Sequence, residues 1–349
     1  MRKYFLMAVM ALSMTVYAKQ DKAERLIDYV NPFVGTDGYG NVYPGAQIPF
    51  GGIQISPDTD EHFYDCASGY KWNRQSIQGF SLTHLSGTGI PDLGDFLFMP
   101  GTGDIKLDPG TDENPDEGYR SRFSHEEEKA TPGYYSVMLK DYGVKAEMTS
   151  AVRSGIFRFT YPKSDKSFIL IDFNHTLWQK CIWSNIRVEN DSVVTGYKLV
   201  KGWGPERHIY FRAVFSKPLK NFMIYQDKKP VIYNTSRFRS NREAWGPNIM
   251  FTASFATDDN EVVTVKTSIS AISTDGAALN MRELDGMTFD SVKALAEQKW
   301  EKELSTYTIK GTQEQKETFY TSAYHAALCP FVYNDADGSY LGLDKNVEK

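Results

Sequence analysis

Short alternating or β-branched apolar runs dominate the chain from about residue 19 to residue 285, and Gly, Pro, Asn and Asp residues interrupt them. Such runs are typical of half-buried strands. Because little helical periodicity lies between the runs, we predict a mainly β protein with a large antiparallel β-sandwich. The clearest predicted strands lie in YYSVMLKDYGVKAEMTS, AVRSGIFRFTYP, FILIDFN, HIYFRAVFS, NIMFTASFA and EVVTVKTSIS.

The hydrophobic pattern changes to a helical period near residue 285. In MTFDSVKALAEQKWEKELSTY the apolar residues recur at helical spacing, which predicts a helix with one buried face. Thr312 and Gln315 form a capping-box pattern ahead of KETFYTSAYHAALC, and Pro330 stops a helix, so a second helix is predicted from Thr312 to Cys329. The β domain is therefore expected to give way to α structure here.

The first twenty residues, MRKYFLMAVMALSMTVYAKQ, differ from the rest of the chain. They combine a basic start, an apolar run from Tyr4 to Val16, and Val16 and Ala18 placed like a small-residue cleavage site. This pattern predicts a secretory signal peptide over residues 1–18. The apolar run is shorter than the roughly 20 residues of a membrane-spanning helix, and no later segment reaches that length. We predict a secreted or periplasmic protein with no membrane span.

The composition excludes one class of partner. The 349 residues carry a net charge of −5, and the Lys and Arg residues are scattered rather than gathered into a stripe. A nucleic-acid-binding surface needs such a basic stripe, so no nucleic-acid partner is predicted. Cys66, Cys181 and Cys329 are too few for a disulfide framework, although an oxidising compartment allows one pair. The sequence indicates no oligomeric state.

The stretch LTHLSGTGIPDLGD, Leu82 to Asp95, concentrates chemically useful residues and includes His84, one of only six histidines. It lacks the GxSxG pattern of a nucleophile elbow, and its glycines match neither a dinucleotide-binding nor a Walker pattern. Composition alone favours a glycine-rich loop between strands, in which His84 is structural. A contact between His84 and a substrate is the competing hypothesis.

Three other stretches are rich in small or aromatic residues. VNPFVGTDGYGNVYPGAQIPFGGIQISPDT is predicted to be a rigid loop, and rigid loops at the end of a sandwich commonly bind ligands. In FYDCASGYKW, the rings of Tyr64, Tyr70 and Trp72 either stack on a sugar or fill a core, and the core is favoured. NDADGSYLGLD resembles a calcium loop, but its twelfth position falls on Asp344, where an EF-hand has Glu.

The most conspicuous carboxylates of the chain are consecutive: Glu126, Glu127 and Glu128. A run of like charges is typical of a solvated loop or strand end. We therefore predict that these three side chains face solvent, and we assign them no chemistry.

Five blocks of sequence together resemble glycoside hydrolase family 92, the calcium-dependent, inverting α-mannosidases. The blocks are VNPFVGTDGYGNVYPGAQIPFGGIQISPDT, SGYKW with GFSLTHLSGTGIPDLGD, RSRFSHEEEKATPGYYSVML, WGPERHIYFRAVFSKP and FYTSAYHAALCPFVYNDADGSYLGLD. The resemblance implies an N-terminal β-sandwich over residues 19–285, linker helices over 286–310, and an (α/α)6 catalytic barrel that begins within 311–349. A barrel of twelve helices needs several hundred residues, so the chain is expected to be truncated early in the barrel.

The resemblance also implies a site. The substrate, a mannose-containing glycan, is expected in the cleft between sandwich and barrel, where Tyr64, Asp65, Cys66, His84 and Asp344 are the candidate substrate-binding residues. Relatives that cleave α-1,2 linkages tend to carry Trp where this chain has Tyr64, so α-1,3, α-1,4 and mannose-phosphate substrates also stay open.

The resemblance assigns no catalytic group within this chain. It implies that the catalytic acid, the catalytic base and the Ca²⁺ ligands belong to barrel segments beyond it. The alternative hypothesis is a carbohydrate-binding sandwich without hydrolytic activity, or an inactive gene fragment.

Overall fold

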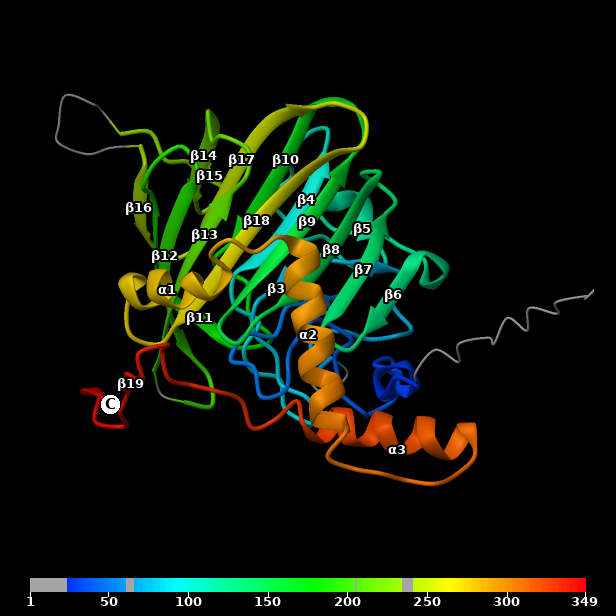
Figure 1. Cartoon of the computed structure of the whole chain (residues 1–349). Helices are drawn as coiled ribbons and strands as arrows, with labels where there is room; N and C mark the ends of the chain where they lie inside the picture. The colour runs from blue at the N-terminus through cyan, green and yellow to red at the C-terminus, as the bar shows by residue number, and fades with distance from the viewer. Residues whose placement is uncertain (1–23, 61–65, 205, 234–240) are drawn as a thin grey trace, which may run out of the picture.

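The computed structural model describes residues 24–60, 66–204, 206–233 and 241–349, and shows two packed β-sheets with helices on one side (Figure 1). Every pairing between strands in the described ranges is antiparallel. The predicted fold class, a mainly β chain with an antiparallel sandwich followed by helices, is confirmed.

One sheet has seven strands and the other has nine. In spatial order the seven-stranded sheet contains β1 (Ser56–Asp58), β3 (Gly79–Ser81), β4 (Leu97–Thr102), β10 (Ser164–Asp172), β17 (Ile249–Thr257), β14 (Asn221–Gln226) and β15 (Lys229–Pro230). The nine-stranded sheet contains β16 (Glu243–Gly246), β11 (Lys180–Val188), β12 (Val193–Lys201), β13 (Arg207–Phe215), β18 (Glu261–Ser270), β9 (Ser154–Tyr161), β8 (Val144–Ser150), β7 (Tyr134–Leu139) and β6 (Glu128–Thr131). Two small pairs complete the strands: β2 (Ser76–Ile77) with β5 (Ser121–Arg122), and β19 (Tyr340–Leu341) with β20 (Val347–Glu348).

The helices are α1 (Thr274–Met281), α2 (Phe289–Leu304) and α3 (Gln313–Ala326), with short 3₁₀ turns η1 (Leu26–Tyr29), η2 (Pro115–Glu117), η3 (His125–Glu127) and η4 (Arg282–Leu284). Both capping boxes at the starts of α2 and α3 are formed, and that of α3 uses Thr312 and Gln315 as predicted. Helix α3 ends at Ala326, before the predicted end at Cys329. Helix α1 was not predicted because TDGAALNM carries no clear apolar stripe. The domain boundaries inferred from the sequence stay predictions.

The core lies between the inner faces of the two sheets, where aromatic rings from both sheets meet. Phe98 of β4 packs against Phe157 of β9 and Phe211 of β13, with ring centroids 4.9 and 6.4 Å apart. Strand β9 is buried on both faces, because Ile156 on its outer face packs against Phe289 and Val292 of α2. Helix α2 therefore covers the outer face of β9 around Ile156.

Two central strands were not among the clearest sequence signals, and each has a structural reason. The register of β11 shifts between Cys181 and Trp183, so its alternation is broken. Strand β12 has Gly196 in its middle, where an added Cβ would lie 2.4 Å from the ring of Phe173 and 2.6 Å from that of Phe211. The glycine is therefore required by close packing of the aromatic core.

The helices join the sandwich through a second apolar cluster. The ring of Trp300 in α2 is fully buried, its centroid lies 4.5 Å from that of Tyr324 in α3, and its Nε1 donates to the Gln47 carbonyl at 2.7 Å. One indole thus connects two helices and the long loop before β1.

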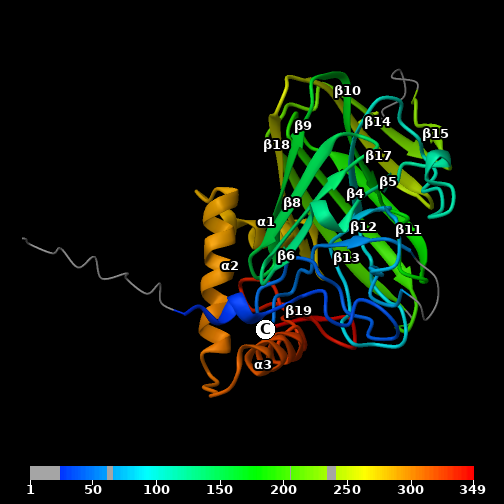
Figure 2. The same cartoon turned by 90° about the vertical axis from the view of Figure 1, so that its right-hand side faces the viewer.

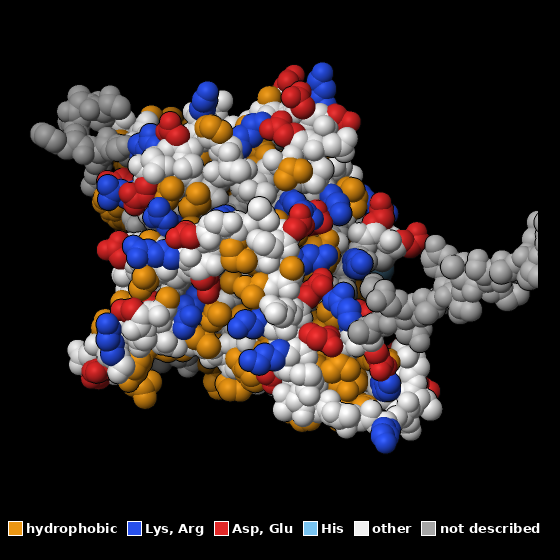
Figure 3. Space-filling view, in the orientation of Figure 1, with side chains coloured by type: hydrophobic (Ala, Val, Ile, Leu, Met, Phe, Trp, Pro, Cys, Tyr) orange, Lys and Arg blue, Asp and Glu red, His pale blue; other side chains and the backbone are white. Residues whose placement is uncertain are grey.

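The distribution of charged side chains on the surface agrees with the scattered Lys and Arg residues of the sequence. On the face shown in Figure 3, basic and acidic side chains alternate and apolar side chains are scattered among them. No helix in the described part of the chain has both the length and the apolar character needed to cross a membrane.

We predict that Trp300→Ala lowers the free energy of unfolding by about 3–5 kcal/mol, because it removes a buried ring and leaves the Gln47 carbonyl without its donor. Denaturant unfolding monitored by circular dichroism measures this loss. Lys299→Ala, an exposed neighbour on the same helix, is the control. Equal stability of the two variants would contradict the connecting role of the indole.

Candidate functional site

The long loop before β1, the loop between β3 and β4 and the start of the segment after α3 meet at one end of the sandwich, as Figure 1 shows in blue, cyan and red. Backbone hydrogen bonds join them across long sequence distances. Phe50 N–H donates to the Ala327 carbonyl at 3.2 Å, Val332 N–H donates to the Phe50 carbonyl at 2.9 Å, and Gly87 N–H donates to the Asn41 carbonyl at 2.7 Å. These segments therefore form one loop surface, which we call the loop end.

Of the predicted substrate-binding residues, the structure describes Cys66, His84 and Asp344, which have different surroundings. Tyr64 and Asp65 lie outside the described residues. Cys66 is buried, and burial raises the pKa of its thiol to about 12, so the thiol is neutral and inert at neutral pH. Asp344 is exposed between β19 and β20, and its carboxylate accepts bonds from Asn346 N–H at 3.1 Å and Asn346 Nδ2 at 2.7 Å.

His84 is fully buried, and protein atoms surround both ring nitrogens. Nδ1 lies 2.8 Å from the Gln54 carbonyl oxygen, and Nε2 lies 2.7 Å from Asp58 Oδ1 and 3.1 Å from Ser81 Oγ. A sugar hydroxyl has no open path to this ring. The structure therefore favours the structural interpretation of His84 over a substrate contact.

The partner of His84 is a buried carboxylate that holds a second histidine. Asp58, which ends β1, is fully buried, and His175 Nε2 lies 2.9 Å from its Oδ2. Burial opposes ionisation of Asp58, but the charge of His84 and the hydrogen bonds from both histidines outweigh it and lower the pKa of the carboxyl. Asp58 thus connects the loop after β3 with the loop after β10.

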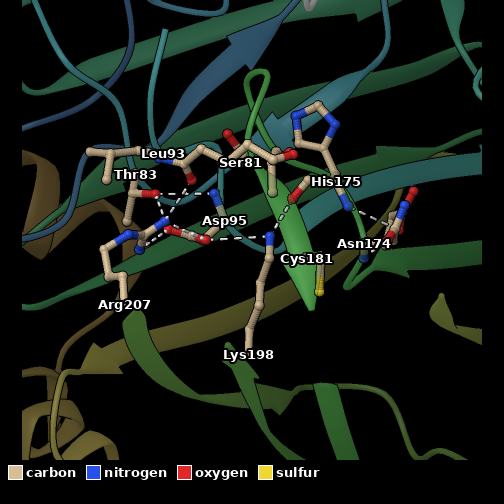
Figure 4. A network of polar contacts seen from close by, with 12 residues as sticks. Ser81, Thr83, Leu93, Asp95, Asn174, His175, Cys181, Lys198 and Arg207 are labelled. Atoms are coloured by element: carbon tan, nitrogen blue, oxygen red, sulfur yellow. Dashed lines mark hydrogen bonds and ion pairs between the residues drawn. The ribbon is translucent and has the colours of Figure 1, made fainter. Parts of the chain in front are cut away.

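A second buried carboxylate, Asp95, lies at the other end of the same sequence motif (Figure 4). Arg207 binds it with both terminal nitrogens, at 2.6 and 3.1 Å, and Lys198 Nζ lies 3.3 Å away. The Thr83 hydroxyl donates to it at 2.7 Å and accepts from the Asp95 N–H at 3.0 Å. Burial raises the pKa of Asp95, but the two cations outweigh this effect and lower it.

The two carboxylate networks are connected. Lys198 pairs with Asp95 and also donates to the backbone carbonyl of His175, whose ring binds Asp58. The stretch from Leu82 to Asp95 is a loop between β3 and β4, and buried charge networks hold it at both ends through Thr83, His84 and Asp95.

Sequence reasoning missed most of the partners in these networks. It did not single out Asp58, His175, Lys198 or Arg207. One signal was available, because Lys198 occupies an inward-facing position of β12 between the buried residues Gly196 and Val200. A lysine at such a position needs a buried acidic partner.

The prediction that Glu128 faces solvent is wrong. Its side chain is fully buried and accepts hydrogen bonds from Tyr70 OH at 3.0 Å, Tyr135 OH at 2.5 Å and His125 Nδ1 at 2.7 Å. Burial raises the pKa of this carboxyl above its ordinary value. Glu128 begins β6, and the strand turns its side chain inward, whereas Glu126 and Glu127 are exposed as predicted.

Of the aromatic residues predicted in FYDCASGYKW, Tyr70 lies in the core and Trp72 lies at the surface. Tyr70 is buried, which confirms its core assignment. Trp72 is 36% exposed and stacks on the His125 ring, with centroids 3.6 Å apart and planes at 5°. His125 Nε2 also lies 2.8 Å from the Trp72 carbonyl, so the indole is fixed in place at the loop end.

The segment after α3 is attached to the sandwich around a small cavity of about 110 Å³, lined by Arg153, Arg207, Tyr333 and Asp335, among others. Asp335 accepts from Ser270 Oγ at 2.8 Å and from Asn280 Nδ2 at 2.7 Å. Asp337 accepts from the N–H and hydroxyl of Ser339, so it stabilises a turn.

The described residues do not supply a calcium shell from acidic, histidine or cysteine side chains. In the ranges that the structure describes, no group of three or more such residues could hold a metal ion.

Two family models match consecutive parts of the chain. Residues 29–270 match the N-terminal domain of glycosyl hydrolase family 92, and residues 276–349 match the catalytic domain of the same family. The chain belongs to glycosyl hydrolase family 92. The first match covers the sandwich, and the second covers most of α1, helices α2 and α3, and the segment after them.

Solved structures of family 92 proteins superpose on the chain. A GH92 alpha-mannosidase from Bacteroides thetaiotaomicron is 71% identical, with a TM-score of 0.92, over 93% of this chain and 44% of that one. An inverting mannosidase from the same organism is 27% identical, with a TM-score of 0.79, over 93% of this chain and 43% of that one.

One curated relative also matches the chain. An uncharacterized secreted glycosidase of Arthroderma benhamiae is 24% identical over 347 residues, which is 88% of this chain and 42% of that protein. The chain thus spans less than half the length of the relatives it matches.

We predict that Asp95→Asn lowers the free energy of unfolding by about 3–5 kcal/mol at neutral pH, because the change leaves Lys198 and Arg207 without their buried counter-ion. Denaturant midpoints measure the loss. Asp104→Asn, which breaks an exposed pair with Lys166, is the control and should change little.

The same variant has a pH signature. Because the pKa of Asp95 is lower in the folded state, its contribution is complete above the unfolded value of about 3.9 and is lost as pH falls below that value. The stability gap between wild type and Asp95→Asn should therefore shrink below about pH 4. A gap that is constant from pH 7 to pH 3 would show that the lost charge is not the cause.

Proposed function

We propose that the full-length protein containing this chain is an α-mannosidase that hydrolyses terminal α-linked mannose from glycans, and that this chain supplies the sandwich side of its sugar cleft. The observation that carries the proposal is the 71% identity to a GH92 alpha-mannosidase over nearly the whole chain. That relative has also been solved in complex with mannoimidazole, a mannose-type ligand.

The geometry favours a role for this chain in binding the sugar rather than in the chemical step. Three of its buried acids, Asp58, Asp95 and Glu128, are each bound by protein partners, so none of these three is free to protonate a glycosidic oxygen. Exposed groups of this chain include the ring of Trp72 at the loop end and the carboxylate of Asp344 in the segment between β19 and β20. These groups suit binding and orientation of a sugar.

The catalytic acid and base are proposed to come from the part of the catalytic domain that lies outside the residues of this chain. An inverting glycosidase places the two carboxyl groups about 6.5–9.5 Å apart, with water between the base and the sugar. Calcium dependence is likewise proposed, with ligands outside the described residues. When bound, the ion would act as a Lewis acid and would orient sugar hydroxyls.

Export is part of the proposal. Its support is the leader-like pattern of residues 1–18, which lie outside the described residues, and the fungal relative that is named a secreted glycosidase.

We expect the full-length protein to release mannose from linkage-defined α-mannosides, and a chelator of Ca²⁺ to abolish the release, with recovery on adding Ca²⁺. Proton NMR of the first product should show β-mannose, because inversion is proposed. Retention of configuration, or full activity in chelator, would contradict that part. Binding of mannosides without any release would favour the carbohydrate-binding module.

We predict that Asp344→Asn lowers kcat/KM for α-mannosides by about ten- to a hundredfold, because hydrogen bonds from sugar hydroxyls to a carboxylate are stronger than those to an amide. Steady-state kinetics measure the change. The control is Asp337→Asn. Asp337 is also exposed, but its carboxylate accepts a hydrogen bond from Ser339 within a turn. An equal loss of kcat/KM in both variants would show that Asp344 stabilises a turn and does not bind the sugar.

A further inference from the structure

A groove of about 890 Å³ opens on the sandwich, in the size range of ligand sites. Its lining includes the end of β10, the loop from residue 174 to residue 180 and the turn between β14 and β15. Figure 2 shows β14, β15 and β11 on the side of the molecule opposite α2. The three helices do not cover this side.

One wall of the groove presents an exposed tryptophan on a fixed loop. The side chain of Trp178 is 52% exposed, although its backbone has φ +82°, a conformation that bulky residues rarely adopt. The residues around it fix this geometry, because the Thr176 hydroxyl donates to the Gln179 carbonyl at 2.6 Å and Leu177 N–H donates to the Leu93 carbonyl at 3.0 Å. The chain thus bears backbone strain to present a ring outward.

Another part of the lining is the two-residue turn between β14 and β15, which carries polar side chains. Asp227 and Lys228 both have positive φ, as a type I′ turn requires. Asn248 Nδ2 donates to Asp227 Oδ1 at 2.7 Å, and Asp227 N–H donates to the Asn248 carbonyl at 3.2 Å. Lys228 pairs with Asp108, so this wall is also fixed.

The floor is polar and belongs to the buried networks. Asp172 is 8% exposed, and it accepts from Tyr119 OH at 3.0 Å and from the N–H groups of Asn174 and His175 at 2.7 and 3.2 Å. Figure 4 shows Asn174 and His175 beside the Asp95 network. Asn174 itself is exposed, so its amide is accessible from the groove.

This combination fits one class of ligand. A flat indole face suits the C–H face of a pyranose, and amide and carboxylate groups suit its hydroxyls. The groove carries both acidic and basic side chains, so it does not select a charged ligand. Its walls offer too few aliphatic side chains to hold an apolar peptide.

We propose that this groove is a saccharide-binding site in which Trp178 stacks on a sugar ring and Asn174 and Asn248 bind its hydroxyls. The choice of a mannose-containing glycan as ligand rests on the proposed function. The groove and its fixed walls are observed independently of that function.

The test uses the full-length protein and the variant Trp178→Gly. Glycine adopts positive φ without strain, so this variant removes the ring while the loop should keep its conformation. Affinity electrophoresis in gels containing yeast mannan measures binding, and initial rates on a small aryl α-mannoside measure the catalytic site. Trp245→Ala, at a 42% exposed tryptophan that does not line the groove, is the matched control.

We expect Trp178→Gly to weaken mannan retention about tenfold, to unfold at an unchanged or higher denaturant concentration, and to keep the aryl mannoside rate within about twofold. Asn174→Ala should weaken retention in the same direction. Unchanged retention in Trp178→Gly, or an equal weakening in Trp245→Ala, would overturn the proposal. A parallel loss on the aryl mannoside would overturn it as well, because the ring would then act at the catalytic site.

The experiments can refute the proposed function and the proposed saccharide site independently of each other. If the protein releases no mannose but its retention depends on Trp178, the hydrolase proposal fails and the groove stands. If the protein releases mannose but Trp178→Gly leaves mannan retention unchanged, the saccharide-site proposal is wrong and the hydrolase proposal is retained.

Discussion

The arrangement of the loop end depends on buried charge pairing. Asp95 lies two residues before β4 of the seven-stranded sheet, whereas its partners Lys198 and Arg207 belong to β12 and β13 of the nine-stranded sheet. A buried charge without a partner costs several kcal/mol, so any packing that separates these groups is strongly disfavoured. The apolar core holds the two sheets together, but apolar contacts are tolerant of small shifts. The Asp95 network fixes how the sheets meet at this end.

The alternation of apolar residues was enough to predict the sandwich, since β7, β8, β9, β17 and β18 each read as strands and bury alternate or continuous faces. The site was less predictable, because its partners are far apart in sequence. Asp58 and His175 are separated by 117 residues, and Asp95 and Arg207 by 112. Local periodicity shows that a side chain points inward, but not which distant charge it meets. Only the family resemblance could indicate the loops that come together.

Glu128 shows that a run of charged residues in the sequence does not establish that each side chain faces solvent. Three consecutive glutamates suggest a solvated face, yet the third begins a strand and faces the core, where two tyrosine hydroxyls and a histidine replace water around its carboxylate. The same contact positions the ring that stacks on Trp72. A buried acid is therefore used here to orient an exposed aromatic side chain, and the sequence pattern cannot distinguish this use from solvation.

The loop end and the groove share one support. Lys198 pairs with Asp95 beneath the loop end and also holds the carbonyl of His175 at the groove floor. Gly94 packs so closely on Leu177 that a Cβ would lie 2.7 Å from its Cγ, and Leu177 precedes the strained Trp178. Movement of the loop before β4 would therefore disturb the loop that carries the indole. Because both loops are held by the same buried groups, the shapes of the two surfaces are set together when the sandwich folds, rather than when a ligand binds.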